Sequence, residues 1–122
     1  MLAEFQKVRQ IPEEGFRRWF SDPELDLIVW YADDTLDEVL GFQVCYDKGS
    51  AQRALTWQRG RGFSHDRIDD GEASPLRNRT PILVADGVFP KERVVRTFRE
   101  RAGDIEEDLA SFVTAVVESY PD

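Results

Sequence analysis

The chain has 122 residues, a formal net charge of -8 and a single cysteine. Domains commonly span about 100–200 residues, so we expect residues 1–122 to form a single domain. The net negative charge argues against broad, sequence-independent nucleic-acid binding, which depends on neutralising phosphates. One cysteine excludes an intrachain disulfide and a zinc ribbon.

The composition is that of a folded protein, because Ile, Leu, Val and Phe together exceed a quarter of the chain, above the roughly 20% typical of disordered chains. No run approaches the roughly 18 apolar residues of a membrane helix. The N-terminus lacks the basic and apolar regions of a signal peptide. With one free thiol, these features predict a cytoplasmic protein, and the excess of arginine over lysine is typical of GC-rich bacteria.

The first two-thirds of the chain are predicted to form strands separated by short polar turns. Residues 25–31 are almost entirely apolar beyond Asp26, which predicts a strand covered on both faces. Residues 39–46 alternate with a period of two. Leu40, Phe42, Val44 and Tyr46 share one face of that strand, and Cys45 lies on the other. The other runs with strand character are residues 16–20, 53–58, 81–85 and, with a weaker signal, 5–11.

Residues 59–81 interrupt this pattern, because they are rich in glycine and proline and poor in aliphatic side chains. We interpret the segment as a long loop. Loops of that length within a domain are uncommon and are usually functional or mobile.

The C-terminal third is predicted to be helical. Pro90 suits the first position of one helix, and Gly103 is placed to end it in the left-handed conformation. Asp104 and Glu107 then have the spacing of a capping box for a second helix. The apolar residues of the second helix lie on one continuous face: Ile105, Leu109, Phe112, Val113, Val116 and Tyr120.

These elements predict an α+β fold. An antiparallel meander of four to six strands is followed by two helices, and the apolar face of the last helix packs across one face of the sheet.

The densest polar segment is residues 57–72. His65 is the only histidine, so an acid–base role near neutral pH would fall to it, with Asp66 as a candidate to orient its ring. Ser64 is not placed in a nucleophile elbow. A surface loop is also expected to carry such residues for structural reasons alone.

The same segment is a relatively basic island in an acidic chain, which indicates a possible site for an anion. Its arginines could equally pair with neighbouring aspartates. Candidate ligand-binding residues are Trp57, Arg59, Arg61, Phe63, His65, Arg67, Asp69 and Asp70. We expect no cofactor and no metal, because the aspartates and His65 match no known metal-ligand spacing.

Aromatic residues are abundant in the predicted strands. If helices cover only one face of the sheet, a second copy of the chain is the simplest partner for the other face, because two-fold dimers dominate among oligomers. Cys45 is expected to be a buried, inert thiol.

Several runs carry a family resemblance: residues 41–47, 54–57, 62–72 and 80–87. Their pattern, GFQVCYD, ALTW, GFSH, DDGE and TPILVADG, resembles a family of small uncharacterised bacterial proteins. The resemblance implies no activity, cofactor or catalytic residue.

Three functions remain open. The first is a non-catalytic binding or interaction domain that presents residues 57–72 to a small anionic ligand or a partner. The second is a small-molecule enzyme in which His65 is the acid–base group and arginines clamp an anion. The third is an RNA-contacting protein. The absence of a nucleophile–base pair and the charge of -8 favour the first.

Overall fold

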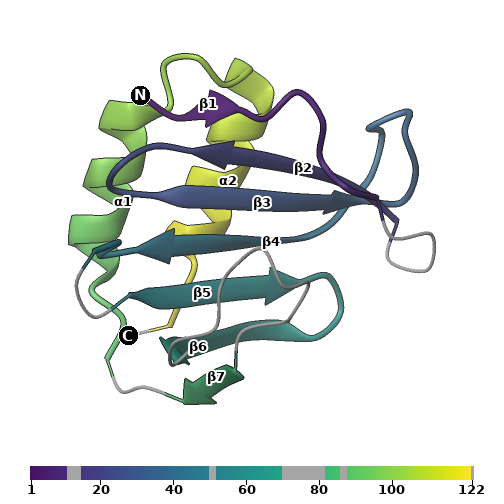
Figure 1. Ribbon diagram of the computed structural model, residues 1–122. Coiled ribbons are helices and arrows are strands. Elements are labelled where there is room, and N and C mark those ends of the chain that lie inside the picture. The colour runs from purple at the N-terminus through teal and green to yellow at the C-terminus, as the bar shows by residue number, and fades with distance from the viewer. Residues whose placement is uncertain (11–14, 50–51, 70–81, 86–87, 122) are drawn as a thin grey trace.

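The structure, a computed structural model, describes residues 1–10, 15–49, 52–69, 82–85 and 88–121. Seven strands form one antiparallel sheet in chain order, and two helices follow them (Figure 1). This confirms the predicted α+β arrangement. The strands are β1 Ala3–Glu4, β2 Phe16–Ser21, β3 Asp26–Tyr31, β4 Val39–Tyr46, β5 Arg53–Gln58, β6 Gly62–Asp69 and β7 Ile82–Ala85, and the helices are α1 Lys91–Arg101 and α2 Glu107–Glu118.

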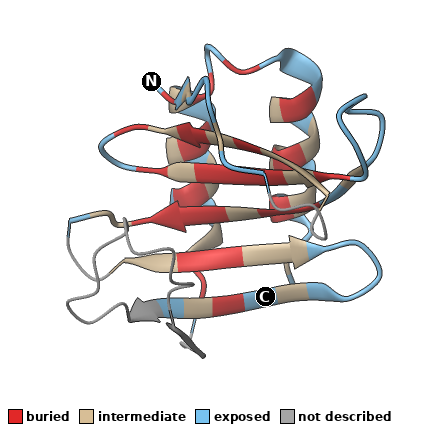
Figure 2. Ribbon diagram, turned by 45° about the vertical axis from the view of Figure 1, so that its right-hand side comes forward, coloured by how far each residue is buried: buried red, intermediate tan, exposed pale blue. Residues whose placement is uncertain are grey.

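Both helices lie on the same face of the sheet (Figure 1). The strand register aligns Phe20, Leu27, Val44 and Leu55 across four neighbouring strands, and all four are buried. Figure 2 shows that buried residues are concentrated in the central strands. The helices bury the residues that face them, Val94 and Phe98 from α1 and Leu109, Val113 and Val117 from α2. Each such side chain contributes about 1.5–3 kcal/mol when fully buried, so this layer holds the core.

The expectation of a loop over residues 59–81 is wrong for its first part, because residues 62–69 form β6. Gly60 and Gly62 have positive φ values of 83° and 89°, so the glycines make the turn between β5 and β6. Beyond them, Phe63 and His65 alternate with polar residues and pair with β5. The remainder, residues 70–81, lies outside the described residues.

The expected faces of β4 change at its start. A register shift between Trp30 and Tyr31 pairs Tyr31 with Val39 instead of Leu40. Val39 therefore packs against the core, whereas Leu40 is 38% exposed. A bulge of this kind adds one residue to a strand and reverses the faces beyond it.

The expected N-terminal strand is also misplaced. The residues that pair with β2 are Ala3 and Glu4, not residues 5–11, of which 5–10 are described without strand pairing. Gln10 instead hydrogen-bonds the backbone of Arg17 through its side chain. The Gln10 side chain thus takes the hydrogen bonds that a neighbouring strand would make to Arg17.

The helix ends differ from the predicted caps. α1 ends at Arg101, and Gly103 is absent from the residues with positive φ. The carbonyl oxygen of Arg101 accepts the amide of Leu2 at 2.9 Å, so the N-terminal segment supplies the donor that a glycine cap would. α2 begins at Glu107 without a side-chain cap from Asp104, so the capping-box prediction is wrong.

The carboxylate of Glu106, just before α2, is bound instead to Arg18 of β2. Arg18 is 8% exposed and also contacts the carboxylate of Glu4 in β1. Its guanidinium donates to Glu4 at 2.8 and 2.8 Å and to Glu106 at 2.6 and 2.9 Å. Tyr31 Oη lies 3.4 Å away. One side chain therefore joins the edge strand, the sheet and the start of the last helix.

Among the described residues, no helix is both long and apolar enough to cross a membrane.

We expect Arg18→Met to lower the free energy of unfolding by about 2–3 kcal/mol, because charged hydrogen bonds to two carboxylates are lost while the apolar stem is kept. Urea unfolding followed by circular dichroism measures this. Arg99→Met, a change at an exposed arginine of α1, is the matched control and should stay within about 0.5 kcal/mol of the parent chain. Equal effects of the two changes would contradict the anchoring role of Arg18.

Stability should also depend on the ionisation of Glu106. The hydrogen bonds from Arg18 lower the pKa of Glu106 below its usual value of 4.5 in the folded chain. The pair therefore stabilises the fold fully above pH 4.5, and this contribution is lost as the pH falls through the lowered pKa. Glu106→Gln should remove part of the acid-induced loss of stability below pH 4.5, whereas Glu107→Gln should leave the profile unchanged. Identical profiles for Glu106→Gln and the parent chain would count against the pair.

Candidate functional site

The structure divides the sequence-predicted site residues between two faces and two ends of the sheet. Trp57 and Phe63 are directly paired and, with His65, lie on the face that the helices cover. Asp66 is the next residue along β6 and lies on the opposite face. Asp66 therefore cannot orient the His65 ring as the sequence suggested. Asp70 lies outside the described residues, as does Glu72, and of Asp69 only the backbone pairing is described.

His65 is enclosed by aromatic side chains. The residue is 9% exposed, and its Nε2 lies 2.5 Å from the hydroxyl oxygen of Tyr46, which is 1% exposed. The two rings are stacked, with centroids 5.9 Å apart and an interplanar angle of 6°. Phe89 contacts both rings edge-on, and Tyr120 packs against Phe89. These four rings form an aromatic cluster at the end of the core that follows α2, and His65 is one of its members.

A Tyr–His hydrogen bond can pass a proton between its two members, but burial restricts which outside group can reach it. An acid–base catalyst needs its proton within hydrogen-bond reach of a substrate. In this arrangement the hydrogen-bonding capacity of Nε2 is directed at a protein hydroxyl. The geometry therefore makes the pair a buried polar contact within an aromatic cluster.

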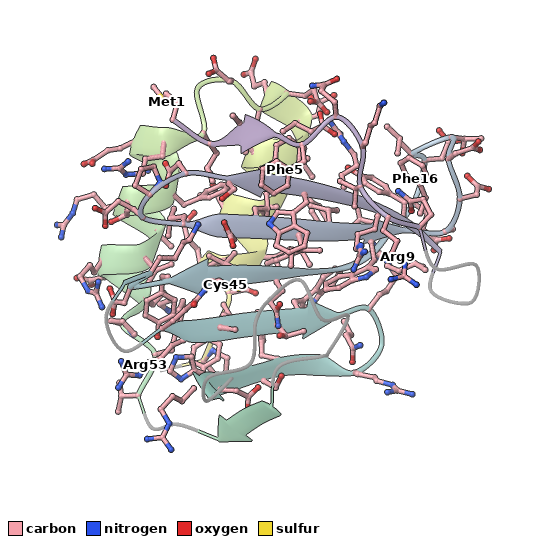
Figure 3. All side chains as sticks on the ribbon, viewed as in Figure 1. Met1, Phe5, Arg9, Phe16, Cys45 and Arg53 are labelled. Carbon is pink, nitrogen blue, oxygen red and sulfur yellow. The ribbon has the colours of Figure 1, made fainter. Side chains whose placement is uncertain are left out.

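Arginines gather beside this cluster at the same end of the sheet. Arg53 is paired with Tyr46 on one side and with Arg67 on the other. The guanidinium of Arg93, in the first turn of α1, lies 5.7 Å from the centre of the Tyr46 ring. Arg53 is labelled in Figure 3, at the start of β5 and towards the segment that leads into α1. We call Arg53, Arg67 and Arg93 the basic end.

The carboxylate of Asp47 also lies at the basic end. Arg93 binds it through two hydrogen bonds of 2.8 and 3.0 Å. The hydrogen bond from Arg93 is the main cause of a lowered pKa at Asp47, and the charge of Arg53 lowers this pKa further. The carboxylate is therefore ionised at neutral pH. Because the charge of Arg53 lowers the pKa of Asp47, Arg53 lies close to the Arg93–Asp47 pair.

The other two predicted arginines lie at the opposite end of the sheet, in the turn between β5 and β6. Arg59 is held there, because its backbone amide donates to the Leu40 carbonyl oxygen at 2.8 Å and its Nε donates to the Val39 carbonyl oxygen at 2.9 Å. Its guanidinium covers the Trp57 ring at 5.4 Å. Arg61 is exposed. Most of the length of β6 separates Arg61 from Arg67, or about 20 Å at the usual rise per residue. The predicted arginines are thus not one site.

Cys45 has the environment predicted for it. The residue is 4% exposed, and burial, with a smaller effect of the Asp26 charge, raises the pKa of its thiol to about 12. Its side chain lies on the face of β4 opposite the helices (Figure 3). A thiol with so high a pKa is protonated near neutral pH and is a poor nucleophile.

Within the described residues, no group of three or more His, Cys, Asp and Glu side chains could hold a metal ion. A groove of about 590 Å³ runs along the outer surface of α1 towards the end of α2. None of the residues predicted from the sequence lines it. Its lining consists of Lys91, Glu92, Val95, Arg96, Arg99, Glu100 and Glu118.

Sequence reasoning missed Tyr46 as the partner of His65, and it missed Arg53 and Arg93 as neighbours of Tyr46. Tyr46 and Arg53 could be predicted as neighbours only if residues 62–69 are treated as a strand. Period-two alternation then places Phe63, His65 and Arg67 on the core face, and Arg67 lies opposite Arg53. Arg93 lies on a helix, and its position over the sheet follows from tertiary packing alone.

Comparison with known proteins adds no relative. The chain matches no family model, no curated protein and no solved structure. The likeness to small bacterial proteins therefore stays a resemblance.

The role of His65 can be tested through stability. His65→Ala should lower the free energy of unfolding by about 1–3 kcal/mol, because it leaves the buried Tyr46 hydroxyl without its nitrogen partner. Ser64→Ala, on the exposed face of the same strand, should change it by less than about 0.5 kcal/mol. Thermal and urea unfolding provide the measurement. A His65→Ala chain as stable as the parent would contradict a structural role and favour a site whose residues are not needed for folding.

Proposed function

We propose that the chain is a cytoplasmic, non-catalytic binding domain that recognises an anionic group, phosphate or carboxylate, at the basic end of the sheet. The observation that carries the proposal is the direct cross-strand pair of Arg53 and Arg67, with the guanidinium of Arg93 on the neighbouring Tyr46 ring. The proposed site therefore includes only the part of residues 57–72 around Arg67, and not the whole segment.

Like charges placed directly opposite each other on neighbouring strands repel. The carboxylate of Asp47 already senses the charge of Arg53, and a binding partner with negative charge would add to this attraction. Arginine suits such a partner because its planar guanidinium can donate two parallel hydrogen bonds to a phosphate or a carboxylate. Asp47 already shows this geometry with Arg93.

The net charge of the chain affects where on its surface an anion is attracted. At a net charge of -8, the chain as a whole repels anions. Charges are screened beyond about 8 Å at physiological ionic strength, so a ligand that reaches the basic end senses mainly the arginines there. This favours a compact anionic group over a long polyanion such as RNA.

The surroundings of His65 support a non-catalytic role. Its Nε2 faces the Tyr46 hydroxyl, and Asp66 projects from the other face of the strand. The enzyme alternative would need His65 to reach a substrate across the aromatic cluster.

Titration of the isotope-labelled chain with inorganic phosphate tests the proposal by NMR. Amide shifts are expected at residues 46–47, 53, 65–67 and 93. Arg67→Ala should weaken phosphate binding by about tenfold, which corresponds to the loss of one charged hydrogen bond. Arg99→Ala, at an exposed arginine farther along α1, should bind as the parent does.

Two results would overturn the proposal. One is the absence of shifts at millimolar phosphate or acetate. The other is a set of shifts confined to residues 58–62, which would move the site to the opposite end of the sheet. A short RNA that binds far more tightly than phosphate, with the same shifts, would replace the compact ligand with a nucleic acid.

A further inference from the structure

The end of the sheet opposite the basic end carries two oppositely charged connections. Residues 32–38 join β3 to β4 and contain four acids, Asp33, Asp34, Asp37 and Glu38. We call this segment the acidic loop. Residues 58–62 join β5 to β6 and contain Arg59 and Arg61. We call this segment the arginine hairpin. Both connections lie at the same end of the sheet and are exposed (Figures 1 and 2).

The two connections are adjacent where they meet the start of β4. The acidic loop closes through a 3.0 Å hydrogen bond from the Ala32 amide to the Glu38 carbonyl oxygen and leads directly into Val39 and Leu40. The arginine hairpin is bonded to those same two residues through Arg59. Their relative position is therefore set by contacts to the backbone.

Despite this proximity, no ion pair joins the two connections in the part of the chain that the structure describes. The Arg59 side chain instead contacts the Val39 carbonyl oxygen and the Trp57 ring. The acids of the loop are exposed to solvent. Within the described residues, the opposite charges of the two connections are thus not paired with each other.

Two exposed leucines accompany these charges. Leu36 at the tip of the acidic loop is 40% exposed, and Leu40 beside the hairpin is 38% exposed. Leu40 is turned outward by the bulge between Trp30 and Tyr31. Apolar side chains with a rim of charge are the usual composition of a protein–protein contact.

We propose that this end of the sheet is a homodimer interface, in which the acidic loop of one copy faces the arginine hairpin of the other and the leucines meet between them. A two-fold interface uses the same patch on both copies, so the patch must contain both complementary halves. The acidic loop and the arginine hairpin meet that requirement. A partner of another kind would need only one sign of charge here.

Light scattering from micromolar to millimolar concentration tests this proposal. The mass of the parent chain should rise from 14.1 kDa towards twice that value. The dimer should dissociate in about 1 M salt, where the screening length falls to about 3 Å. Asp37→Arg and Arg61→Glu should each remain monomeric at concentrations where the parent is dimeric, because each reverses one half of both contacts.

An equimolar mixture of the two variants supplies the sharpest readout. In a mixed dimer the two reversed side chains, now of opposite sign, would face each other in one contact, and the other contact would be the native one. The mixture should therefore recover the dimer mass. Glu100→Arg and Arg99→Glu are controls that change the net charge equally on α1 and should dimerise as the parent does. Leu40→Ser should weaken the dimer without changing the charge.

Several outcomes would overturn the interface. A parent chain that stays at 14.1 kDa throughout removes the dimer. A dimer that both reversals leave intact lies on another face. A mixture that stays monomeric shows that the two connections do not pair. Growth beyond two copies contradicts a closed two-fold contact. Because phosphate binding is measured at the other end of the sheet, failure here leaves the proposed function to be judged by its own titration.

Discussion

The position of Arg18 is the constraint on which the arrangement of the sheet edge and the last helix depends. A guanidinium whose residue is 8% exposed needs hydrogen-bonding partners, because an unpaired buried charge is very costly. Glu4 and Glu106 meet that need from opposite directions. The pairing therefore requires β1 at the edge and α2 above it at the same time. Replacing such a network with apolar residues can be neutral in stability, so we regard its main effect as fixing where these two elements lie.

With the helical layer placed, the alternation of side chains along each strand decides which residues can meet. His65 and Asp66 are adjacent in the chain but are on different faces of the sheet, whereas His65 and Tyr46 are far apart in the chain and 2.5 Å apart in space. The same strand separates Arg67 from Arg61 by most of its length. The protein thus has a basic end next to its aromatic cluster, and the opposite end carries both an acidic and a basic connection.

The strands and helices with regular apolar spacing were predictable because their burial requires that spacing. Residues 25–31, 39–46 and the apolar face of α2 are examples. β6 was hidden because glycine, serine and aspartate around it are typical of turns, and only pairing with β5 makes it a strand. The outward orientation of Leu40 was likewise hidden, because the bulge that causes it depends on pairing with β3. The absence of a cap from Asp104 was hidden too, because the Arg18–Glu106 pair next to it joins residues distant in sequence.

The sequence by itself determined the α+β class, the antiparallel order of the central strands, the inert state of Cys45 and the uneven distribution of charge, because these depend on local period, burial and composition. Only the tertiary structure decided that His65 pairs with Tyr46, that Arg53, Arg67 and Arg93 share one end, and that the acidic loop and the arginine hairpin share the other. Those juxtapositions arise from strand register and from the packing of helices on the sheet, and the free energy that selects them comes from contacts between residues far apart along the chain.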